Sequence, residues 1–210
     1  MRVNLVAPSN QSPDHGNTAH VFSACVFCGS RPGADPRHAA TATALGEAFA
    51  AAGIRLVYGG GGVGLMGIAA RALMRAGGVA VGVIPRFLEQ REVAQAGLSE
   101  LILVDSMHER KARMATLSQA FIALPGGTGT LDELIEITTW AQLGLHDKPI
   151  FLLGDDDYWQ PLLDLITHMI DQGFAAPSAA ALLRRQSSLE ALMASLNALR
   201  ALGQSRQAGG

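Results

Sequence analysis

Short apolar stretches alternate with helical patterns along most of this chain, and the order in which they follow one another restricts the fold more than any other feature. Each apolar stretch is hydrophobic almost throughout, which is typical of strands buried on both faces. Strands joined through helices by short links require right-handed crossovers and a parallel sheet. We therefore expect an α/β fold, a doubly wound, Rossmann-like parallel sheet with helices on both faces. The expected strands are residues 21–28, 55–58, 79–84, 101–104, 120–124 and 150–153. The expected helices are residues 37–52, 65–76, 107–118, 131–143, 159–172 and 188–202.

The two ends of the chain differ in composition from the part between them. Residues 1–20 are polar and rich in Ser, Pro, Asn and Gly, and residues 203–210 are similarly polar. Such segments cannot bury enough apolar surface to fold. We expect a single domain over residues 21–202, with a flexible tail at each end.

Composition excludes several classes of function. The net charge of -2 and the aromatic content of 5% disfavour a protein that binds nucleic acid or an anionic membrane. No run of eighteen apolar residues and no signal-peptide pattern is present, so we expect a cytoplasmic protein.

Cys25 and Cys28 lie an odd number of residues apart in one strand, so their thiols should point to opposite faces as core residues. We predict no metal site, because further ligands at a recognisable spacing are missing.

Ligands of doubly wound sheets collect beyond the carboxyl ends of the strands, so we examined the loops that follow them. The first, C-G-S-R, offers Ser30, which could hold a ligand or simply bond to the backbone of its own turn. The second carries Gly59, Gly61 and Gly64 in a G-x-G-x-x-G pattern before a helix, which favours anion binding. A dehydrogenase remains an alternative, but the next strand ends in Pro85 and not in the acid that a NAD site needs.

A third loop, L-P-G-G-T-G-T-L-D-E at residues 124–133, is a second glycine-rich turn before a helix. It is preceded by D-S-M-H-E-R-K-A-R-M, in which Ser106 and Glu109 have the spacing of a capping box. On the helix that follows, Arg110 falls inside the apolar stripe. An inward guanidinium needs a partner, either a structural carboxylate or a bound anion. Its place beside two glycine-rich turns favours a ligand phosphate or carboxylate.

Two acids follow the third loop. Asp132 and Glu133 could both complement the positive end of their helix. Glu133, however, projects between Ile137 and Trp140, so we expect its carboxylate to be partly desolvated and its pKa to be raised. Such a group can exchange a proton with a leaving group or water, or stabilise an oxocarbenium-like sugar. The pattern predicts a sugar phosphate whose glycosidic bond lies near Glu133.

Four motifs in this order, C-V-F-C-G-S, G-G-G-x-G-L-M-G, M-H-E-R-K and P-G-G-T-G-T-L-D-E, resemble those of the LONELY GUY (LOG) family of cytokinin riboside 5'-monophosphate phosphoribohydrolases. The likeness covers residues 21–172. It implies a Rossmann-like homodimer that hydrolyses the N-glycosidic bond of N6-substituted adenosine monophosphates. The products would be the free base and ribose 5-phosphate, with neither a metal nor a cofactor.

The resemblance also assigns roles to residues by motif. Arg110 and Glu133 would be the catalytic pair. Thr128 stands where plant members often carry tyrosine, which bears on substrate preference. With Ser30 of the first loop, the expected substrate-binding residues are Ser30, Glu92, Lys111, Gly126, Gly127, Thr128, Gly129, Thr130, Asp132 and Thr138.

Two other activities were weighed against hydrolysis. Many relatives carry the label lysine decarboxylase, but the sequence has no recognisable set of residues for a pyridoxal cofactor. A non-catalytic nucleotide or molybdenum-cofactor carrier would use the same glycine turns without needing an acid, and remains the alternative. The preferred N6 substituent, and whether plain AMP is the natural substrate, stay open.

Overall fold

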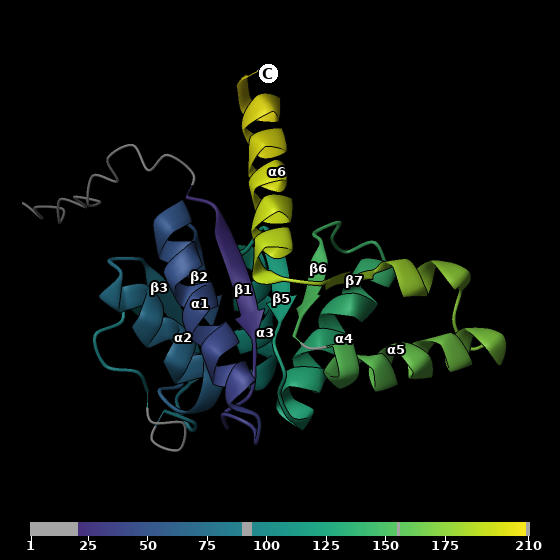
Figure 1. Cartoon of the computed structure of the whole chain (residues 1–210), viewed down its shortest axis with the longest axis horizontal. Helices are drawn as coiled ribbons and strands as arrows, with labels where there is room; N and C mark the ends of the chain where they lie inside the picture. Colours follow the sequence, from purple (N-terminus) through teal and green to yellow (C-terminus); the bar gives the residue numbers. More distant parts are fainter. Residues whose placement is uncertain (1–20, 90–93, 155, 209–210) are drawn as a thin grey trace, which may run out of the picture.

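The computed structural model describes residues 21–89, 94–154 and 156–208. Within them lies one parallel sheet of seven strands in the order β4-β3-β2-β1-β5-β6-β7 (Figure 1). The expected α/β architecture, doubly wound and parallel, is confirmed. The strands are β1 (Ser23–Phe27), β2 (Arg55–Tyr58), β3 (Ala80–Pro85), β4 (Glu100–Val104), β5 (Ala120–Ala123), β6 (Ile150–Leu153) and β7 (Leu183–Gln186).

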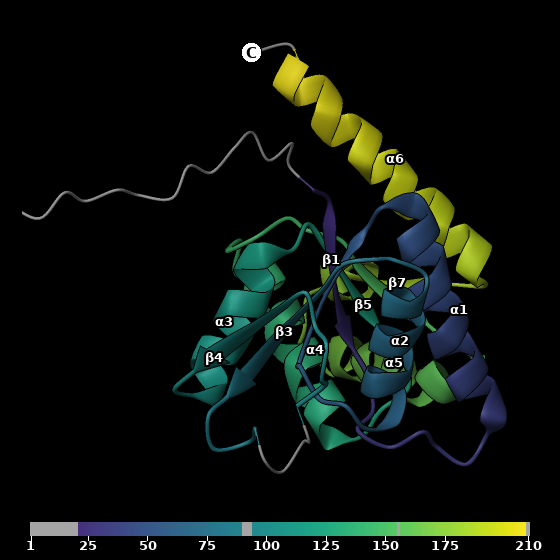
Figure 2. The same cartoon turned by 90° about the vertical axis from the view of Figure 1, so that its left-hand side faces the viewer.

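Helices cover both faces of the sheet. Figure 2 shows α1, α2 and α6 on one side and α3 and α4 on the other. Helices form every connection between successive strands except the one between β3 and β4, so the central strands are enclosed from both directions. The helices are α1 (Pro36–Ala52), α2 (Gly64–Arg75), α3 (Met107–Leu117), α4 (Thr128–Gln142), α5 (Asp156–Asp171) and α6 (Leu189–Ala208), with a 3-10 turn η1 (Pro177–Ala181) before β7.

The two faces carry separate apolar clusters. On one face, Leu45 of α1 and Leu73 of α2 pack against the sheet together with Leu196 of α6. On the other, Met114 of α3 and Trp159 of α5 pack against it. The two cysteines also divide between these clusters, Cys25 in the second and Cys28 in the first, and both are free thiols. The expectation that they point to opposite faces is therefore confirmed.

Several elements differ from those expected. Strand β7 was not predicted, because it is an edge strand with two exposed arginines and one buried residue, Leu183. Helix α4 begins at Thr128 and not at residue 131, because Gly127 supplies its N-cap. Helix α6 continues to Ala208, beyond the tail boundary expected at residue 203. None of the helices in the described ranges has the length and apolarity that crossing a membrane requires.

The strand order reverses direction at β1. From β1 the chain proceeds through β2, β3 and β4 to one edge of the sheet, and then returns to place β5, β6 and β7 on the other side. In sheets of this kind the loops after the two central strands diverge, and they leave a crevice at the carboxyl ends. The crevice should therefore lie between the loops that follow β1 and β5.

Candidate active site

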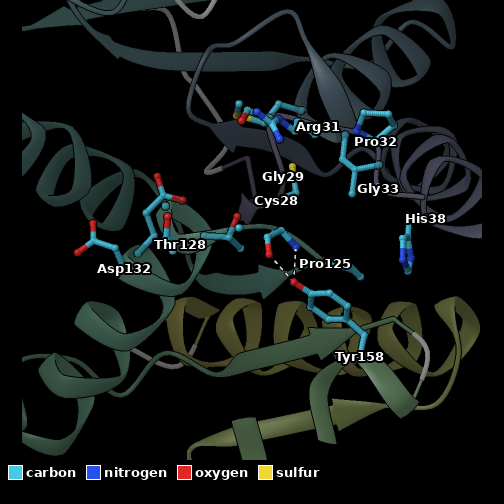
Figure 3. Close-up of a pocket in the computed structure, with 18 of the residues that line it drawn as sticks. Cys28, Gly29, Arg31, Pro32, Gly33, His38, Pro125, Thr128, Asp132 and Tyr158 are labelled. Carbon is cyan, nitrogen blue, oxygen red and sulfur yellow. Dashed lines mark hydrogen bonds between the residues drawn. The ribbon is translucent and has the colours of Figure 1, made fainter. Parts of the chain in front are cut away.

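A cavity of about 660 Å³ occupies the switch point of the sheet. Residues 28–34, which follow β1, form one wall, and residues 125–130, which follow β5, form another. The close-up in Figure 3 shows Arg31, Pro32 and Gly33 on the first of these walls and Thr128 and Asp132 across from them. The loops that the sequence singled out after the first and fifth strands thus meet in one place.

The amino end of α4 opens into this cavity. The N-cap residue Gly127 and the first-turn residues Thr128, Gly129 and Thr130 all line it. The first helical hydrogen bond of α4 runs from the Leu131 amide to the Gly127 carbonyl, at 3.1 Å. The amides of the first turn before Leu131 have no intrahelical acceptor, and they lie at the positive end of the helix dipole. This end of the helix is suited to a phosphate.

The first glycine-rich turn is placed differently, and this corrects the expectation that both turns bind an anion. A Cβ at Gly64 would lie 2.2 Å from the carbonyl carbon of Ser30, so this glycine packs directly against the β1 loop. The Leu65 amide, at the start of α2, donates to the Gly29 carbonyl at 2.9 Å. Residues 59–64 do not line the cavity, which α2 reaches through Leu65 and Met66. This turn is filled by protein.

Arg110 of α3 is buried, with 3% of its surface exposed, as its position in the apolar stripe predicted. Its Nε donates to the Val83 carbonyl at 3.0 Å, and its Nη2 donates to the Gly59 carbonyl at 2.7 Å. Val83 lies within β3 and Gly59 directly follows β2, and sequence reasoning did not anticipate these carbonyls as partners. They fix the guanidinium at the edge of the cavity, which it lines. A buried cation held in this way presents a fixed charge to a ligand.

Helix α3 starts as predicted. The Ser106 hydroxyl accepts a bond from the Glu109 amide at 3.1 Å, and the Glu109 carboxylate accepts one from the Asp105 amide at 2.9 Å. The capping box is therefore present, with its second bond shifted by one residue. Together these bonds fix the first turn of the helix that carries Arg110.

Glu133 of α4 is half-buried and lines the same cavity as Arg110. Because α4 begins at Thr128, both Glu133 and its neighbour Asp132 lie in the second helical turn, and not at the helix start as we had expected. Burial raises the pKa of the Cys28 thiol, and the charge of the nearby Glu133 carboxylate raises it further. Cys28 also lines the cavity. It is therefore a neutral part of the wall at neutral pH, and not a reactive thiolate.

Lys111 holds two helices together. Its Nζ lies 3.0 Å from Oδ2 of Asp132 and 2.9 Å from Oε2 of Glu136, so it connects α3 to α4. Burial opposes its charge, but the hydrogen bonds to Glu136 and Asp132 raise the pKa of Lys111 above its ordinary value. Lys111 does not line the cavity, whereas Asp132 does. We had expected Lys111 to contact the phosphate of the substrate. In the structure it lies outside the cavity and pairs with two carboxylates.

The remaining predicted substrate contacts fall into three groups. Ser30, Gly126 and Thr130 line the cavity, as expected of substrate-binding residues. Thr138 does not line it: this buried side chain donates to the Leu134 carbonyl at 2.7 Å within α4. Glu92 lies outside the described residues. In the part of the chain that is described, no group of three or more His, Cys, Asp and Glu side chains is arranged to hold a metal.

Sequence reasoning missed two aromatic side chains of the cavity. His38 of α1 and Tyr158 of α5 both line it, and their rings meet edge to face with centroids 5.9 Å apart. The Tyr158 hydroxyl accepts a bond from the Gly126 amide at 3.0 Å and donates to the Gly126 carbonyl (Figure 3). Tyr158 follows the carboxyl end of β6. The same rule of inspecting loops after strands would have found it had we applied it to that strand.

Several known proteins are similar to this chain in sequence. Residues 66–196 match the family described as "possible lysine decarboxylase". A probable cytokinin riboside 5'-monophosphate phosphoribohydrolase from Oryza sativa subsp. japonica is 50% identical over 155 residues, 74% of this chain and 64% of the relative. A cytokinin riboside 5'-monophosphate phosphoribohydrolase from Rhodococcoides fascians is 50% identical over 157 residues, 74% of this chain and 79% of the relative. The chain thus spans less than two thirds of the rice protein.

Solved structures with the same fold include two proteins named for the molybdenum cofactor. The molybdenum cofactor carrier protein of Chlamydomonas reinhardtii has a TM-score of 0.64 at 23% identity, covering 86% of this chain and 98% of that one. The molybdenum cofactor binding protein of Rippkaea orientalis has a TM-score of 0.65 at 22% identity, covering 87% and 99%. At these identities the likeness establishes the fold alone. The sequence matches go further, and they show that the chain belongs to the LONELY GUY (LOG) family, to which the description "possible lysine decarboxylase" also refers.

Proposed function

We propose that this protein hydrolyses the N-glycosidic bond of N6-substituted adenosine 5'-monophosphates, releasing the free base and ribose 5-phosphate. The observation that carries the proposal is that Arg110 and Glu133, which come from adjacent crossovers, line the cavity into which the amino end of α4 opens. Over the 74% of the chain that aligns with them, relatives named for this activity are 50% identical to it. No cofactor is needed for the reaction we describe.

The length of α4 sets the orientation of the substrate. The amides of Gly127 to Thr130 would take the 5'-phosphate, as helix starts with open amides do. Glu133 follows Thr130 by three residues, which is about 5 Å along a helix. A ribosyl phosphate that lies along α4 would therefore place its sugar beside the Glu133 carboxylate and its base beyond it.

The chemistry divides between the acid and the cation. Glu133 would take a proton from the attacking water and would stabilise the positive charge that develops on the sugar ring. The water oxygen bonds to the anomeric carbon as the bond to the base nitrogen breaks, and the base leaves with the bonding electrons and takes up a proton. Arg110, fixed by the carbonyls of Val83 and Gly59, would hold the substrate's negative charge and orient the sugar.

The test is product analysis on a panel of nucleotides. Purified protein would be incubated with AMP, N6-isopentenyl-AMP and the corresponding nucleosides, and the released base measured by liquid chromatography. We expect release from a monophosphate by wild-type protein, and a loss of about a thousandfold or more in Glu133→Gln, since this group acts in the transition state. Glu47→Gln, an exposed acid on α1, is the matched control and should remain active.

Each other outcome has a definite meaning. Binding of nucleotides without release of base would support the carrier alternative. Normal hydrolysis by both Glu133→Gln and Arg110→Ala would place the chemistry elsewhere. Comparing the N6-isopentenyl substrate with plain AMP would identify the preferred base, a question on which Thr128 bears through the family resemblance.

We further propose that the protein is a homodimer. Leu131 and Ile135 lie one turn apart on α4 and are 37% and 42% exposed, and Leu143 and Leu145 just beyond its end are 69% and 68% exposed. Large exposed apolar side chains gathered along one helix and just beyond its end are typical of an interface. Ile135→Asp should convert a dimer to a monomer in sedimentation analysis. The cytoplasmic location expected from the sequence stays a prediction.

A further inference from the structure

One side chain outside the family motifs holds the glycine that precedes the α4 start. The Tyr158 hydroxyl accepts a bond from the amide of Gly126 and donates one to the carbonyl of the same residue. Both polar backbone groups of Gly126 are therefore bonded to one hydroxyl group. Gly126 comes directly before the N-cap Gly127, so its orientation sets how the chain enters α4.

The hydroxyl is held in place by the packing of its ring. Tyr158 meets Trp159 edge to face with centroids 5.0 Å apart, and Trp159 is buried with 2% of its surface exposed. The indole Nε1 of Trp159 donates to the Leu153 carbonyl at 3.3 Å, which ties the pair to the end of β6. The Tyr158 ring also meets His38 edge to face. Although Tyr158 is 36% exposed, these two ring contacts restrict where its hydroxyl can lie.

A side chain has no room at Gly126. A Cβ at this position would lie 2.1 Å from Oγ1 of Thr130 and 2.8 Å from the amide nitrogen of Gly29. The neighbouring Gly29 amide donates to the Pro125 carbonyl at 3.1 Å. The loop after β1, the first turn of α4 and the Tyr158 hydroxyl therefore all meet at one residue.

We propose that Tyr158 is a positioning residue of the phosphate site: by bonding both backbone groups of Gly126, it aligns the amides at the start of α4 for the 5'-phosphate. The proposal rests on the proposed function, since it assigns the α4 start to the substrate's phosphate. Tyr158 acts through Gly126 and takes no part in proton transfer. Without the hydroxyl, the Gly126 peptide can rotate, and the amides that follow lose their common direction.

The chain provides a matched control in Tyr58, on β2. Its side chain is 1% exposed, and its hydroxyl has no hydrogen-bond partner within the described part of the chain. It lies in the apolar cluster below α1 and α2 and does not line the cavity. Tyr58→Phe and Tyr158→Phe thus each remove one hydroxyl oxygen. The Tyr58 hydroxyl makes no hydrogen bond in the described part of the chain, whereas the Tyr158 hydroxyl bonds to Gly126.

Calorimetric titration with ribose 5-phosphate and with adenine separates the two halves of the substrate. In Tyr158→Phe we expect the dissociation constant for ribose 5-phosphate to rise about fivefold to tenfold, the usual range for losing a hydrogen-bonded hydroxyl. Affinity for adenine and the melting temperature should not change. In turnover assays KM should rise more than kcat falls, since the lost contact acts on binding. Tyr58→Phe should match wild type in both affinities and in turnover.

Several results would overturn the proposal. Unchanged affinity for ribose 5-phosphate would show that the hydroxyl does not act on the phosphate site, and tighter binding would show that it competes with the phosphate. Equal losses for ribose 5-phosphate and adenine would indicate a general structural role. Wild-type protein that binds no ribose 5-phosphate would also overturn it. The proposed function fails separately, if wild-type protein binds ribose 5-phosphate but releases no base from any nucleotide.

Discussion

The two glycine-rich turns of this protein look alike in sequence and differ in use. Each follows a buried strand and begins a helix, and neither helix start is capped by a side chain among the described residues. At the start of α2 the loop after β1 fills the space in front of the helix, and its Gly29 carbonyl accepts a hydrogen bond from the Leu65 amide. At the start of α4 the space is the cavity itself. The difference teaches that a glycine turn becomes an anion site only where the fold leaves its amides uncovered.

The first turn still serves the site, but indirectly. Its Gly59 carbonyl accepts a bond from Arg110, and the missing Cβ at Gly59 leaves room for the guanidinium. Gly59 of the first turn thus positions a cation, while Gly127 and Gly129 of the second turn line the cavity and are available to a ligand. Substitutions in the first turn should disturb stability or Arg110, and substitutions in the second should disturb binding.

The largest effect on stability is expected at Gly64. Its φ of 58° is unfavourable for alanine, and a Cβ there would meet Ser30 and Arg31 backbone atoms at 2.2 and 2.4 Å. Gly64→Ala should lower the free energy of unfolding by about 3 kcal/mol, the sum of left-handed strain and overpacking. Urea denaturation measures this. Gly77→Ala, with a φ of 79° and open space around the Cβ, should lose about 1 kcal/mol from backbone strain alone.

Gly59→Ala should have the largest effect on activity of any change in the first turn. A Cβ would lie 2.0 Å from Nη2 of Arg110, so the guanidinium must leave its carbonyl partners. We expect kcat/KM to fall about a hundredfold, or about 2.7 kcal/mol of transition-state stabilisation. If the effect passes through Arg110, the double variant Gly59→Ala/Arg110→Lys should be no worse than Arg110→Lys. Additive losses would show that Gly59 acts by another route.

The sequence predicted the parallel sheet and the convergence of loops because both depend on local patterns. Buried strands are apolar whatever surrounds them, and the carboxyl ends of parallel strands meet at one edge. Arg110 could be placed inward because helical periodicity fixes its direction relative to Met114. These inferences needed no knowledge of what covers each loop. The catalytic roles of Arg110 and Glu133 stay proposals.

What the sequence could not predict depends on contacts between distant segments. Nothing local distinguishes the turn at Gly64, which is plugged by Ser30, from the turn at Gly127, which is open. The carboxylate partners of Lys111 lie one helix away, so Lys111 was indistinguishable from a phosphate ligand. Strand β7 escaped because an edge strand with two arginines lacks the apolar signature.

Lys111→Gln tests whether Lys111 connects α3 to α4 or contacts a substrate phosphate bound at the second turn. Losing its pairs with Asp132 and Glu136 should lower the free energy of unfolding by about 1 kcal/mol at neutral pH. Because the pKa of Lys111 is raised on folding, its stabilisation is complete below its ordinary value of 10.5. It is lost as the pH rises through the higher folded pKa, so the variant should approach wild type there. A KM increase above about tenfold, without loss of stability, would instead indicate phosphate contact.

The smallest effect on stability is expected at Gly129 in the second turn. Alanine should stabilise the protein there, whereas it should destabilise the protein at Gly64 in the first turn. No atom lies within 4 Å of a Cβ placed there, and its φ is not in the left-handed region, so alanine should favour the helix by about 0.5 kcal/mol. Gly129 also lines the cavity, however, so we expect the added methyl to obstruct a phosphate and raise KM about threefold to tenfold. Gly203→Ala, an exposed helical glycine of α6 with similar free space, should gain stability without altering KM. If Gly129→Ala gains stability and its KM is unchanged, the phosphate does not approach this turn. The reason is that a methyl group placed in space that a ligand occupies must weaken the binding of that ligand.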